Sequence, residues 1–501
     1  MLTFHHVTII QKSNDRVLLD DLTFSLQAGD KIGVIGEEGN GKSTLLRAVS
    51  RPEAVREQFD VQGRIECWGL IGYLPQRPDE EWLGKPVRDI LSAVPDYELY
   101  DPLARVGLDE GVIESSQIFG TLSGGEKVKL QLALLLAQQP DVLLLDEPTN
   151  DLDLATLQWL EDFICDCRVP VLFVSHDTTL LQNAATGLLH IEQLQNKQLS
   201  RVTIAHIPYD EYVTQRQHGI EKDTQVADKQ RSDDRARQER WLHVYQQVEK
   251  EQRNISRADP AGGRLLKKKM KAVKSQERRF DREREQFVEY PAFERAIMAH
   301  FEPVDIPAKK VVVDLRLPAL EVPDRVLARD VSLFVAGPER IGIVGQNGCG
   351  KSTLLHHVYE HLRQNAKFVL GYMPQNYEQA LDPAQTVIDF LADTPALRKL
   401  ASNHLACMKF TQAEIKGPIG RLSGGQRAKV LLLHMILRRA EVLVLDEPTR
   451  NFSALSAPVI RQTLTQFGGA IISISHDRQY LAQVCTRVLV LTPEGLRAGG
   501  D

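Results

Sequence analysis

The stretch Leu122-Ser123-Gly124-Gly125-Glu126 has the features of a helix start, and the chain contains it twice. Ser123 suits the N-cap position, and Glu126 follows three residues later, as a capping box requires. The two glycines leave backbone amides bare, so an anion can approach them. One such stretch alone is an ordinary capped helix. The second copy is Leu422-Ser423-Gly424-Gly425-Gln426, and each copy lies the same distance before an apolar run that ends in Asp-Glu-Pro-Thr. This repetition indicates a functional motif and not only a capped helix.

Four further motifs recur in the same order, so the chain contains an internal repeat. Gly36-Glu37-Glu38-Gly39-Asn40-Gly41-Lys42-Ser43-Thr44 recurs as Gly345-Gln346-Asn347-Gly348-Cys349-Gly350-Lys351-Ser352-Thr353. The three shorter pairs are Tyr73-Leu74-Pro75-Gln76 and Tyr372-Met373-Pro374-Gln375, Asp146-Glu147-Pro148-Thr149 and Asp446-Glu447-Pro448-Thr449, and Ser175-His176-Asp177 and Ser475-His476-Asp477. We expect one domain at residues 1–205 and another at 311–501. Apolar strands alternate with helical patterns in both, which predicts an α/β fold with mostly parallel sheets.

The glycine-rich stretches fit the P-loop pattern G-x-x-x-x-G-K-[ST], each after an expected strand and before an expected helix. Backbone amides of such a loop surround the β-phosphate of a nucleotide, and Lys42 and Lys351 neutralise its β- and γ-phosphates. The hydroxyls of Ser43 and Ser352 are expected to bind Mg²⁺. Asp146 and Asp446 end buried strands, where they can hold the same ion through water, as Walker B aspartates do.

The repeated Leu-Ser-Gly-Gly-[Glu/Gln] stretch resembles the signature motif of ATP-binding-cassette (ABC) ATPases. The resemblance implies two P-loop NTPase domains, each of which closes its signature over the ATP held by the other. The implied nucleotide-binding residues of the signatures are Ser123, Gly124, Gly125, Glu126, Ser423, Gly424, Gly425 and Gln426. It also implies that Glu147 and Glu447 polarise the attacking water. Gln76 and Gln375 would contact Mg²⁺ and water, and His176 and His476 would contact the γ-phosphate.

The two halves differ after the Asp-Glu-Pro-Thr motif. Asn150-Asp151-Leu152-Asp153 has the usual D-loop pattern of the family, and Arg450-Asn451-Phe452-Ser453 departs from it. Because D-loops lie at the domain interface in this family, we expect the two sites to differ in hydrolysis or in timing. No aromatic residue that would stack on adenine stands before either P-loop; in the first half its expected place is near Ser13-Asn14.

Residues 206–310 repeat nothing and are expected to form a helical hairpin joining the two domains. Only Gly219 could break a helix between Tyr209 and Arg257, an arm of roughly 70 Å if straight. Asp259-Pro260-Ala261-Gly262-Gly263 is a turn signal, and a second helix is expected from Arg264 to Phe287. The basic residues near the turn are candidates for RNA contacts: Arg253, Arg257, Arg264, Lys267, Lys268, Lys269, Lys271 and Lys274. On charge alone, a solvated helical face explains them equally well.

Composition narrows the class of protein. The 501 residues carry a net charge of −6, which by itself indicates no partner. The six cysteines are scattered and lack the spacing of a zinc or iron–sulfur site, so we interpret them as reduced thiols of a cytoplasmic protein. No apolar run approaches the roughly 18 residues that span a bilayer, and the N-terminus lacks the regions of a signal peptide.

Two ABC domains in one chain, an intervening charged hairpin and no membrane span together resemble the ABC-F family. Members act on the ribosome, and their hairpin reaches towards the P-site tRNA and the peptidyl transferase centre. The form Glu447-Pro448-Thr449-Arg450-Asn451-Phe452-Ser453 resembles the branch that protects ribosomes from antibiotics. The resemblance therefore implies ribosomal RNA and P-site tRNA as partners, no membrane, and a monomer whose domains pair within one chain.

Three other functions stay open from the sequence. The first is a housekeeping ABC-F translation factor, although the additional arm common in that branch is missing here. The second is the ATPase subunit of a transporter with a separate membrane protein, which would have no use for a basic hairpin. The third is a DNA-repair or chromosome ATPase, in which a coiled coil divides one ABC domain instead of separating two complete ones.

Overall fold

The computed structural model describes residues 1–150, 152–194, 199–254, 260–284, 301, 303–323, 325–365, 367–408 and 410–499. Contacts divide the chain into two compact units. The first unit comprises residues 1–210 and 293–501 and contains both α/β domains, here called the N-terminal and C-terminal cassettes; the second comprises residues 211–292.

Each cassette is built on a six-stranded sheet, and the two sheets have the same strand order. The N-terminal sheet has the order β5-β6-β7-β3-β8-β9, and the C-terminal sheet has the order β13-β14-β15-β12-β16-β17. The N-terminal strands are β3 (Lys31–Gly36), β5 (Ile71–Leu74), β6 (Val142–Asp146), β7 (Val171–Val174), β8 (Gly187–Leu194) and β9 (Leu199–Ala205). The C-terminal strands are β12 (Arg340–Val344), β13 (Leu370–Met373), β14 (Val442–Asp446), β15 (Ala470–Ile474), β16 (Arg487–Thr492) and β17 (Gly495–Ala498).

Neighbouring strands in these sheets run parallel, except for the last pair of each sheet, which is antiparallel: β8 with β9 and β16 with β17. Every residue of β6 and β14 is buried, as uninterrupted apolar runs in a parallel sheet require. The predicted α/β class is confirmed, and so are the buried strands predicted to end at Asp146 and Asp446. Because the strands run the same way, Asp146 and Asp446 both lie at carboxyl ends, where such sheets bind ligands.

Antiparallel strands extend each cassette, and the sequence reasoning did not anticipate them. They are β1 (Leu2–Gln11), β2 (Arg16–Leu26) and β4 (Phe59–Cys67), in the order β2-β1-β4, and the pair β10 (Val311–Val322) and β11 (Arg325–Ala336). The helices of the α/β cores are α1 (Lys42–Ser50), α2 (Pro52–Gln58), α6 (Leu154–Asp166), α7 (Thr178–Ala184), α10 (Lys351–Asn365), α15 (Ala457–Thr465) and α16 (Arg478–Gln483). Buried side chains of β1, β2, β3 and α1 share one apolar core, which fixes the first P-loop between strand and helix.

A helical subdomain carries each signature, in the segments between Gln76 and Ser123 and between Gln375 and Ser423. Its helices are α3 (Val87–Leu91), α4 (Asp96–Val106) and α5 (Gly124–Ala137) in one cassette, and α11 (Val387–Leu391), α12 (Pro395–Cys407), α13 (Gln412–Lys416) and α14 (Gly424–Leu437) in the other. Short 3₁₀ turns are η1 (Glu80–Trp82), η2 (Glu110–Val112), η3 (Phe119–Thr121), η5 (Tyr377–Gln379) and η6 (Ile419–Arg421).

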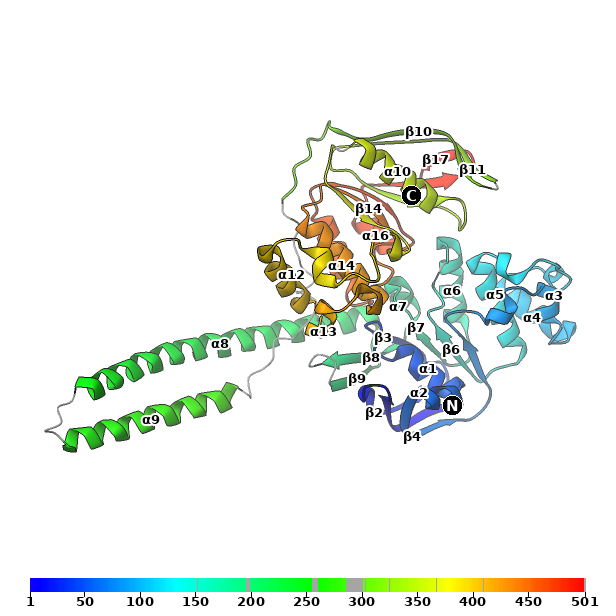
Figure 1. Ribbon diagram of the computed structural model, residues 1–501. Coiled ribbons are helices and arrows are strands. Elements are labelled where there is room, and N and C mark those ends of the chain that lie inside the picture. Colours follow the sequence, from blue (N-terminus) through cyan, green and yellow to red (C-terminus); the bar gives the residue numbers. More distant parts are fainter. Residues whose placement is uncertain are drawn as a thin grey trace. The chain divides into compact units, whose positions relative to one another are not determined.

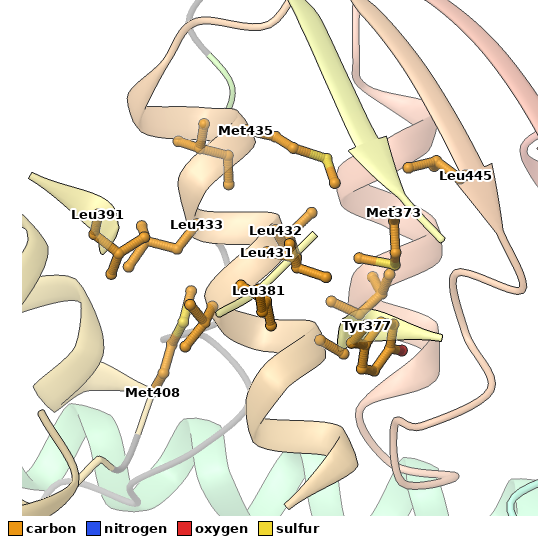
Figure 2. Packing of buried hydrophobic residues seen from close by; sticks show 14 of the residues in the cluster. Met373, Tyr377, Leu381, Leu391, Met408, Leu431, Leu432, Leu433, Met435 and Leu445 are labelled. Carbon is orange, nitrogen blue, oxygen red and sulfur yellow. The ribbon is translucent and has the colours of Figure 1, made fainter. Parts of the chain in front are cut away.

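The core of the C-terminal helical subdomain holds α14 in place. Figure 2 shows Leu431 and Leu432 of α14 beside Met373, which ends β13, and Tyr377. All four side chains are buried. The apolar faces of α11 and α12 join the same cluster. This packing fixes the start of α14, and therefore the position of its signature residues, relative to the sheet.

The second unit consists of two long helices, α8 (Tyr209–Asn254) and α9 (Pro260–Arg284), of which α8 begins two residues before that unit (Figure 1). The indole Nε1 of Trp241 donates to the carbonyl of Val273 at 2.9 Å, and Arg237 Nη1 lies 3.0 Å from Glu283 Oε2. These contacts join the helices side by side and confirm the predicted helical arms. Among the described residues, no helix is long and apolar enough to cross a membrane.

The predicted turn at Asp259–Gly263 is wrong in its second part. Helix α9 already begins at Pro260 and runs through the two glycines. Proline suits the first turn of a helix because the amide it lacks has no partner there. Arg257 and Asp259 lie outside the described residues, as do the predicted last residues of the second arm after Arg284.

Candidate nucleotide sites and basic tip

The first P-loop connects β3 to α1 and requires glycine at its first position. Gly36 has a φ of +151°, and a Cβ there would lie 2.4 Å from the carbonyl oxygen of Ile191. Lys42 Nζ donates to the carbonyls of Gly36 at 2.8 Å and of Glu37 at 3.1 Å. Asn40 Nδ2 donates to Ile191 O at 3.0 Å, so this side chain fixes the loop against β8.

The second P-loop repeats this arrangement between β12 and α10. Lys351 Nζ donates to the carbonyls of Gly345 at 2.8 Å and of Gln346 at 2.9 Å. Burial lowers the pKa of both Lys42 and Lys351, and nearby carboxylates oppose that shift. Each loop therefore presents a desolvated ammonium group, which interacts more strongly with phosphate than an ammonium group in water.

An oxygen donor set suited to Mg²⁺ lies beside each P-loop. Ser43 Oγ donates to Asp146 Oδ1 at 2.8 Å, and the Tyr73 hydroxyl lies 3.3 Å from Asp146 Oδ2. Burial raises the pKa of Asp146 and of Asp446, and a hydrogen bond from Ser43 or Ser352 opposes this shift. No group of three or more His, Cys, Asp and Glu side chains that could hold a metal occurs in the described part of the chain. Mg²⁺ fits this site because it takes few protein ligands and shares its coordination with phosphate oxygens and water.

Glu147 follows β6 directly and has a φ of +51°, a strained value for a side chain of this kind. His176 Nε2 lies 3.0 Å from Glu147 Oε1. Burial raises the pKa of Glu147, but the charge and hydrogen bond of His176 and the charge of Lys42 lower it by more. The net effect is a lowered pKa, so this carboxylate is ionised at neutral pH and can act as a base.

Glu447 has the same φ of +51° but a different environment. His476 Nε2 lies 3.7 Å from Glu447 Oε1, and the backbone amide of His476 donates to Glu447 Oε2 at 3.3 Å. Burial raises the pKa of Glu447 to about 8, since the amide hydrogen bond only partly offsets it. The two corresponding carboxylates therefore differ in protonation at neutral pH.

A cavity of about 1090 Å³ joins the second P-loop to the N-terminal cassette. Its wall contains residues of the C-terminal cassette that the sequence predicts for the nucleotide site: Asn347, Gly348, Gly350, Lys351, Ser352, Thr353, Gln375, Asp446, Glu447 and His476. The N-terminal cassette contributes Gln76, Gly124 and His176. The structure thus brings the second P-loop and the first signature to one cavity, while Lys42, Ser43, Asp146 and Glu147 do not line it.

Both signatures have the predicted capping boxes. The amide of Ser123 donates to Glu126 Oε2 at 2.8 Å, and the amide of Glu126 donates to Ser123 Oγ at 3.2 Å. In the second copy the corresponding distances, between Ser423 and Gln426, are 3.1 and 3.3 Å. The start of α14 contacts the first P-loop, because the amides of Gly424 and Gly425 donate to the carboxylate of Glu38.

Three contacts in these sites escaped the sequence reasoning. The Tyr73 hydroxyl bonds Asp146, and the sequence signal for this tyrosine is its recurrence as Tyr372 in the second half. Arg325 Nη2 donates to Gly348 O in the second P-loop at 3.0 Å and lines the cavity. A short repeat, Arg16-Val17-Leu18 and Arg325-Val326-Leu327, could have indicated this arginine. In the divergent D-loop, Asn451 Nδ2 donates to the Tyr377 hydroxyl at 2.7 Å, and Asp151 of the other D-loop lies outside the described residues.

The candidate RNA-contacting side chains within the described residues are all exposed: Arg253, Arg264, Lys267, Lys268, Lys269, Lys271 and Lys274. These seven residues are called the basic tip below. Arg253 pairs with Glu249 at 2.9 Å. Leu266, between Arg264 and Lys267, and Val273, between Lys271 and Lys274, are buried, so the basic side chains lie on the outer face of α9.

Comparison with known proteins places these features in a family. The family described as "ABC transporter" matches residues 19–150 and 328–450. The tylosin resistance ATP-binding protein TlrC of Streptomyces fradiae is 29% identical over 95% of this chain and 95% of its own length. The energy-dependent translational throttle protein EttA of Haemophilus influenzae is 27% identical over 96% of this chain and 90% of its own length.

A plant relative and a solved structure extend the comparison. "ABC transporter F family member 2" of Arabidopsis thaliana is 26% identical over 97% of this chain and 76% of its own length. The fold is similar to that of the archaeal ribosome recycling factor aABCE1, solved with the ribosomal stalk protein aP1, with a TM-score of 0.61. That match has 18% identity and covers 98% of this chain and 89% of the other, so it supports the fold alone.

Proposed function

This chain belongs to the ABC transporter family and hydrolyses ATP as an ABC-F ATPase, and on this premise we propose that it acts on the ribosome and protects it from antibiotics. The proposal places it in the cytoplasm, as a monomer whose cassettes at about residues 1–205 and 311–501 pair with each other. The proposed partners are ribosomal RNA and P-site tRNA near the peptidyl transferase centre. The relatives named for tylosin resistance and for translational control support this direction.

The observation that carries the proposal is the basic tip on a separate helical unit. Two helices of 46 and 25 residues form the hairpin, far more length than is needed to connect two domains. In the described part of the hairpin, the exposed lysines Lys267, Lys268 and Lys269 follow one another. Adjacent exposed ammonium groups favour binding to a nucleic acid, because they neutralise its phosphates and so release the counterions bound there.

The proposed cycle assigns a role to each cassette. ATP with Mg²⁺ binds both P-loops, and the signatures at Ser123 and Ser423 close over the nucleotide of the opposite cassette. Ser43 with Asp146, and Ser352 with Asp446, would hold Mg²⁺, which would supply positive charge beside the phosphates. Closure fixes the hairpin so that the basic tip engages RNA. Glu147 and Glu447 then polarise water, with Gln76, Gln375, His176 and His476 positioning the reacting groups, and hydrolysis releases the ribosome.

The first test is ribosome binding by a tip variant. We expect the triple variant Lys267→Ala, Lys268→Ala, Lys269→Ala to bind ribosomes more weakly in ATP. A plot of log affinity against log salt concentration should also become less steep, with a slope smaller in magnitude by about 2–3. The matched control is Lys222→Ala, Lys229→Ala, Arg235→Ala, which removes the same charge from exposed positions of α8 far from the tip. Equal losses in both variants would show that only general charge matters and would contradict a role for the tip.

The second test is drug susceptibility in a sensitive host that expresses the chain. We expect the intact protein to raise the inhibitory concentration of at least one drug directed at the ribosome, and the triple tip variant to give no protection. Protection by neither form would argue for a housekeeping ABC-F translation factor. Co-purification with a membrane protein instead of ribosomes would favour the ATPase subunit of a transporter.

A further inference from the structure

The first P-loop contains a carboxylate that binds the start of the second signature helix. Glu38 Oε1 accepts from the amide of Gly424 at 3.3 Å, and Oε2 accepts from the amide of Gly425 at 2.5 Å. These are the first two amides of α14, a helix of 14 residues with Ser423 as its N-cap. The absence of side chains at both glycines permits this approach, because a Cβ at Gly425 would lie 3.2 Å from Glu38 Oε2.

The neighbouring glutamate strengthens the same contact. Glu37 Oε1 lies 3.3 Å from Lys429 Nζ, one helical turn after Gly425 on α14. The Lys429 side chain is 11% exposed and that of Glu37 is 28% exposed, so water screens the pair only partly. Two consecutive carboxylates of one P-loop therefore hold one face of the opposite signature helix.

The position of Glu38 matters because helix starts bind anions. Free amides and the helix dipole at the start of α14 favour a negative group. In an ABC ATPase, the same start meets the γ-phosphate of the ATP on the opposite P-loop, which here is the loop that contains Glu38. A carboxylate and a γ-phosphate cannot both occupy these two amides, and their like charges repel each other at this distance.

The second P-loop has no carboxylates at the two corresponding positions. By alignment of the repeat, Gln346 and Asn347 stand where the first loop has Glu37 and Glu38. Both are neutral, and Asn347 lines the open cavity together with Gly124 of the first signature. The second P-loop therefore shows which neutral residues can replace Glu37 and Glu38 in a loop of the same pattern.

We propose that Glu38 is a specificity-determining residue of the first ATP site, where its carboxylate substitutes for the γ-phosphate at Gly424 and Gly425. Without nucleotide, Glu38 and Glu37 keep α14 on the first P-loop. ATP has to displace Glu38 before its γ-phosphate reaches the two amides. ADP lacks that phosphate and leaves the contact intact. The carboxylate therefore weakens ATP binding at this site and leaves ADP binding nearly unchanged.

The test compares ATP with ADP at the first site alone. The background variant Lys351→Ala removes the P-loop lysine of the second site, and displacement of a fluorescent nucleotide measures affinity. We expect Glu38→Asn, which copies Asn347, to lower the Kd for ATP about tenfold, since hydrogen bonds to a charged group contribute that much or more. The Kd for ADP should change less than twofold. Unchanged or weaker ATP binding, or an equal gain for ADP, would overturn the proposal.

A second measurement needs no bound nucleotide. Hydrogen exchange at the amides of Gly424 and Gly425 should be at least fivefold faster in nucleotide-free Glu38→Asn and Glu38→Gln than in the unaltered protein. The control Glu37→Gln, which copies Gln346, loses only the ion pair with Lys429 and keeps the carboxylate that accepts from these amides, so it should speed their exchange by less than twofold. Equal protection in all forms would contradict the contact. Neither measurement involves ribosomes, so failure here is distinguishable from failure of the proposed ribosomal function.

Discussion

Loss of Glu147 and loss of Glu447 should have unequal effects on ATP hydrolysis at neutral pH. A catalytic base has to be deprotonated, so activity rises with pH through its pKa. The pKa of Glu147 is lowered by its 3.0 Å contact with His176, against the effect of burial, and this group is ionised at pH 7. Burial raises the pKa of Glu447 to about 8, and its contact with His476 is longer, at 3.7 Å.

The expected magnitude follows from these protonation states. With a pKa of about 8, Glu447 is about one-tenth ionised at pH 7, about half at pH 8 and about nine-tenths at pH 9. If the ionised sites are equally fast, Glu147→Gln leaves roughly a tenth of the activity at pH 7, and Glu447→Gln leaves roughly nine-tenths. The residual rate of Glu147→Gln should rise about fivefold from pH 7 to pH 8 and about tenfold to pH 9.

The assay is phosphate release at saturating ATP and Mg²⁺, with ionic strength held constant across the pH range. The rate of Glu447→Gln should change little between pH 7 and pH 9, because the remaining base is already ionised. Equal losses in the two variants at pH 7, or a flat pH profile for Glu147→Gln, would refute the assignment of different protonation states to the two carboxylates.

Three further predictions concern stability. Burial lowers the pKa of His434 from 6.5 to about 4, so the unfolded state takes up a proton on this histidine before the folded state does as the pH falls. The free energy of unfolding, measured by urea titration, should therefore fall by about 2 kcal/mol between pH 7 and pH 5 because of His434. The variant His434→Gln should lack this contribution. Arg461 is buried and pairs with Asp477 at 3.1 Å, so Arg461→Ala should cost about 3–5 kcal/mol, and adding Asp477→Asn should restore part of that loss. Trp241→Phe removes the hydrogen bond to Val273, which should cost the hairpin about 1 kcal/mol and speed its proteolysis without altering ATPase activity measured without ribosomes.

Features fixed by local interactions were predictable from the sequence. The capping boxes at Ser123 and Ser423 need only residues three positions apart, and both form. The buried strands β6 and β14 were recognisable as uninterrupted apolar runs, whose burial on both faces is enough to define them. The repeat then implied a common topology, and both sheets indeed have the same strand order.

Features that depend on distant residues were not predictable. Glu38 and Gly424 are 386 positions apart, and no local pattern links a P-loop carboxylate to a helix start in another cassette. The hydrogen bond from Tyr73 to Asp146 depends on β5 and β6 being neighbours in the sheet. The tip turn was misplaced because proline and glycine favour turns but are also accepted in the first turn of a helix, as α9 shows.

Co-sedimentation of the double variant Glu147→Gln, Glu447→Gln with ribosomes in ATP tests the central claim most directly. Both substitutions remove the proposed catalytic carboxylates and leave the P-loops and signatures intact, so ATP should hold the cassettes closed. We predict that the double variant sediments with ribosomes in ATP but not in ADP, and that adding the triple lysine tip substitutions releases it. A double variant that stays in the supernatant in ATP would contradict an ATP-driven engagement of the ribosome.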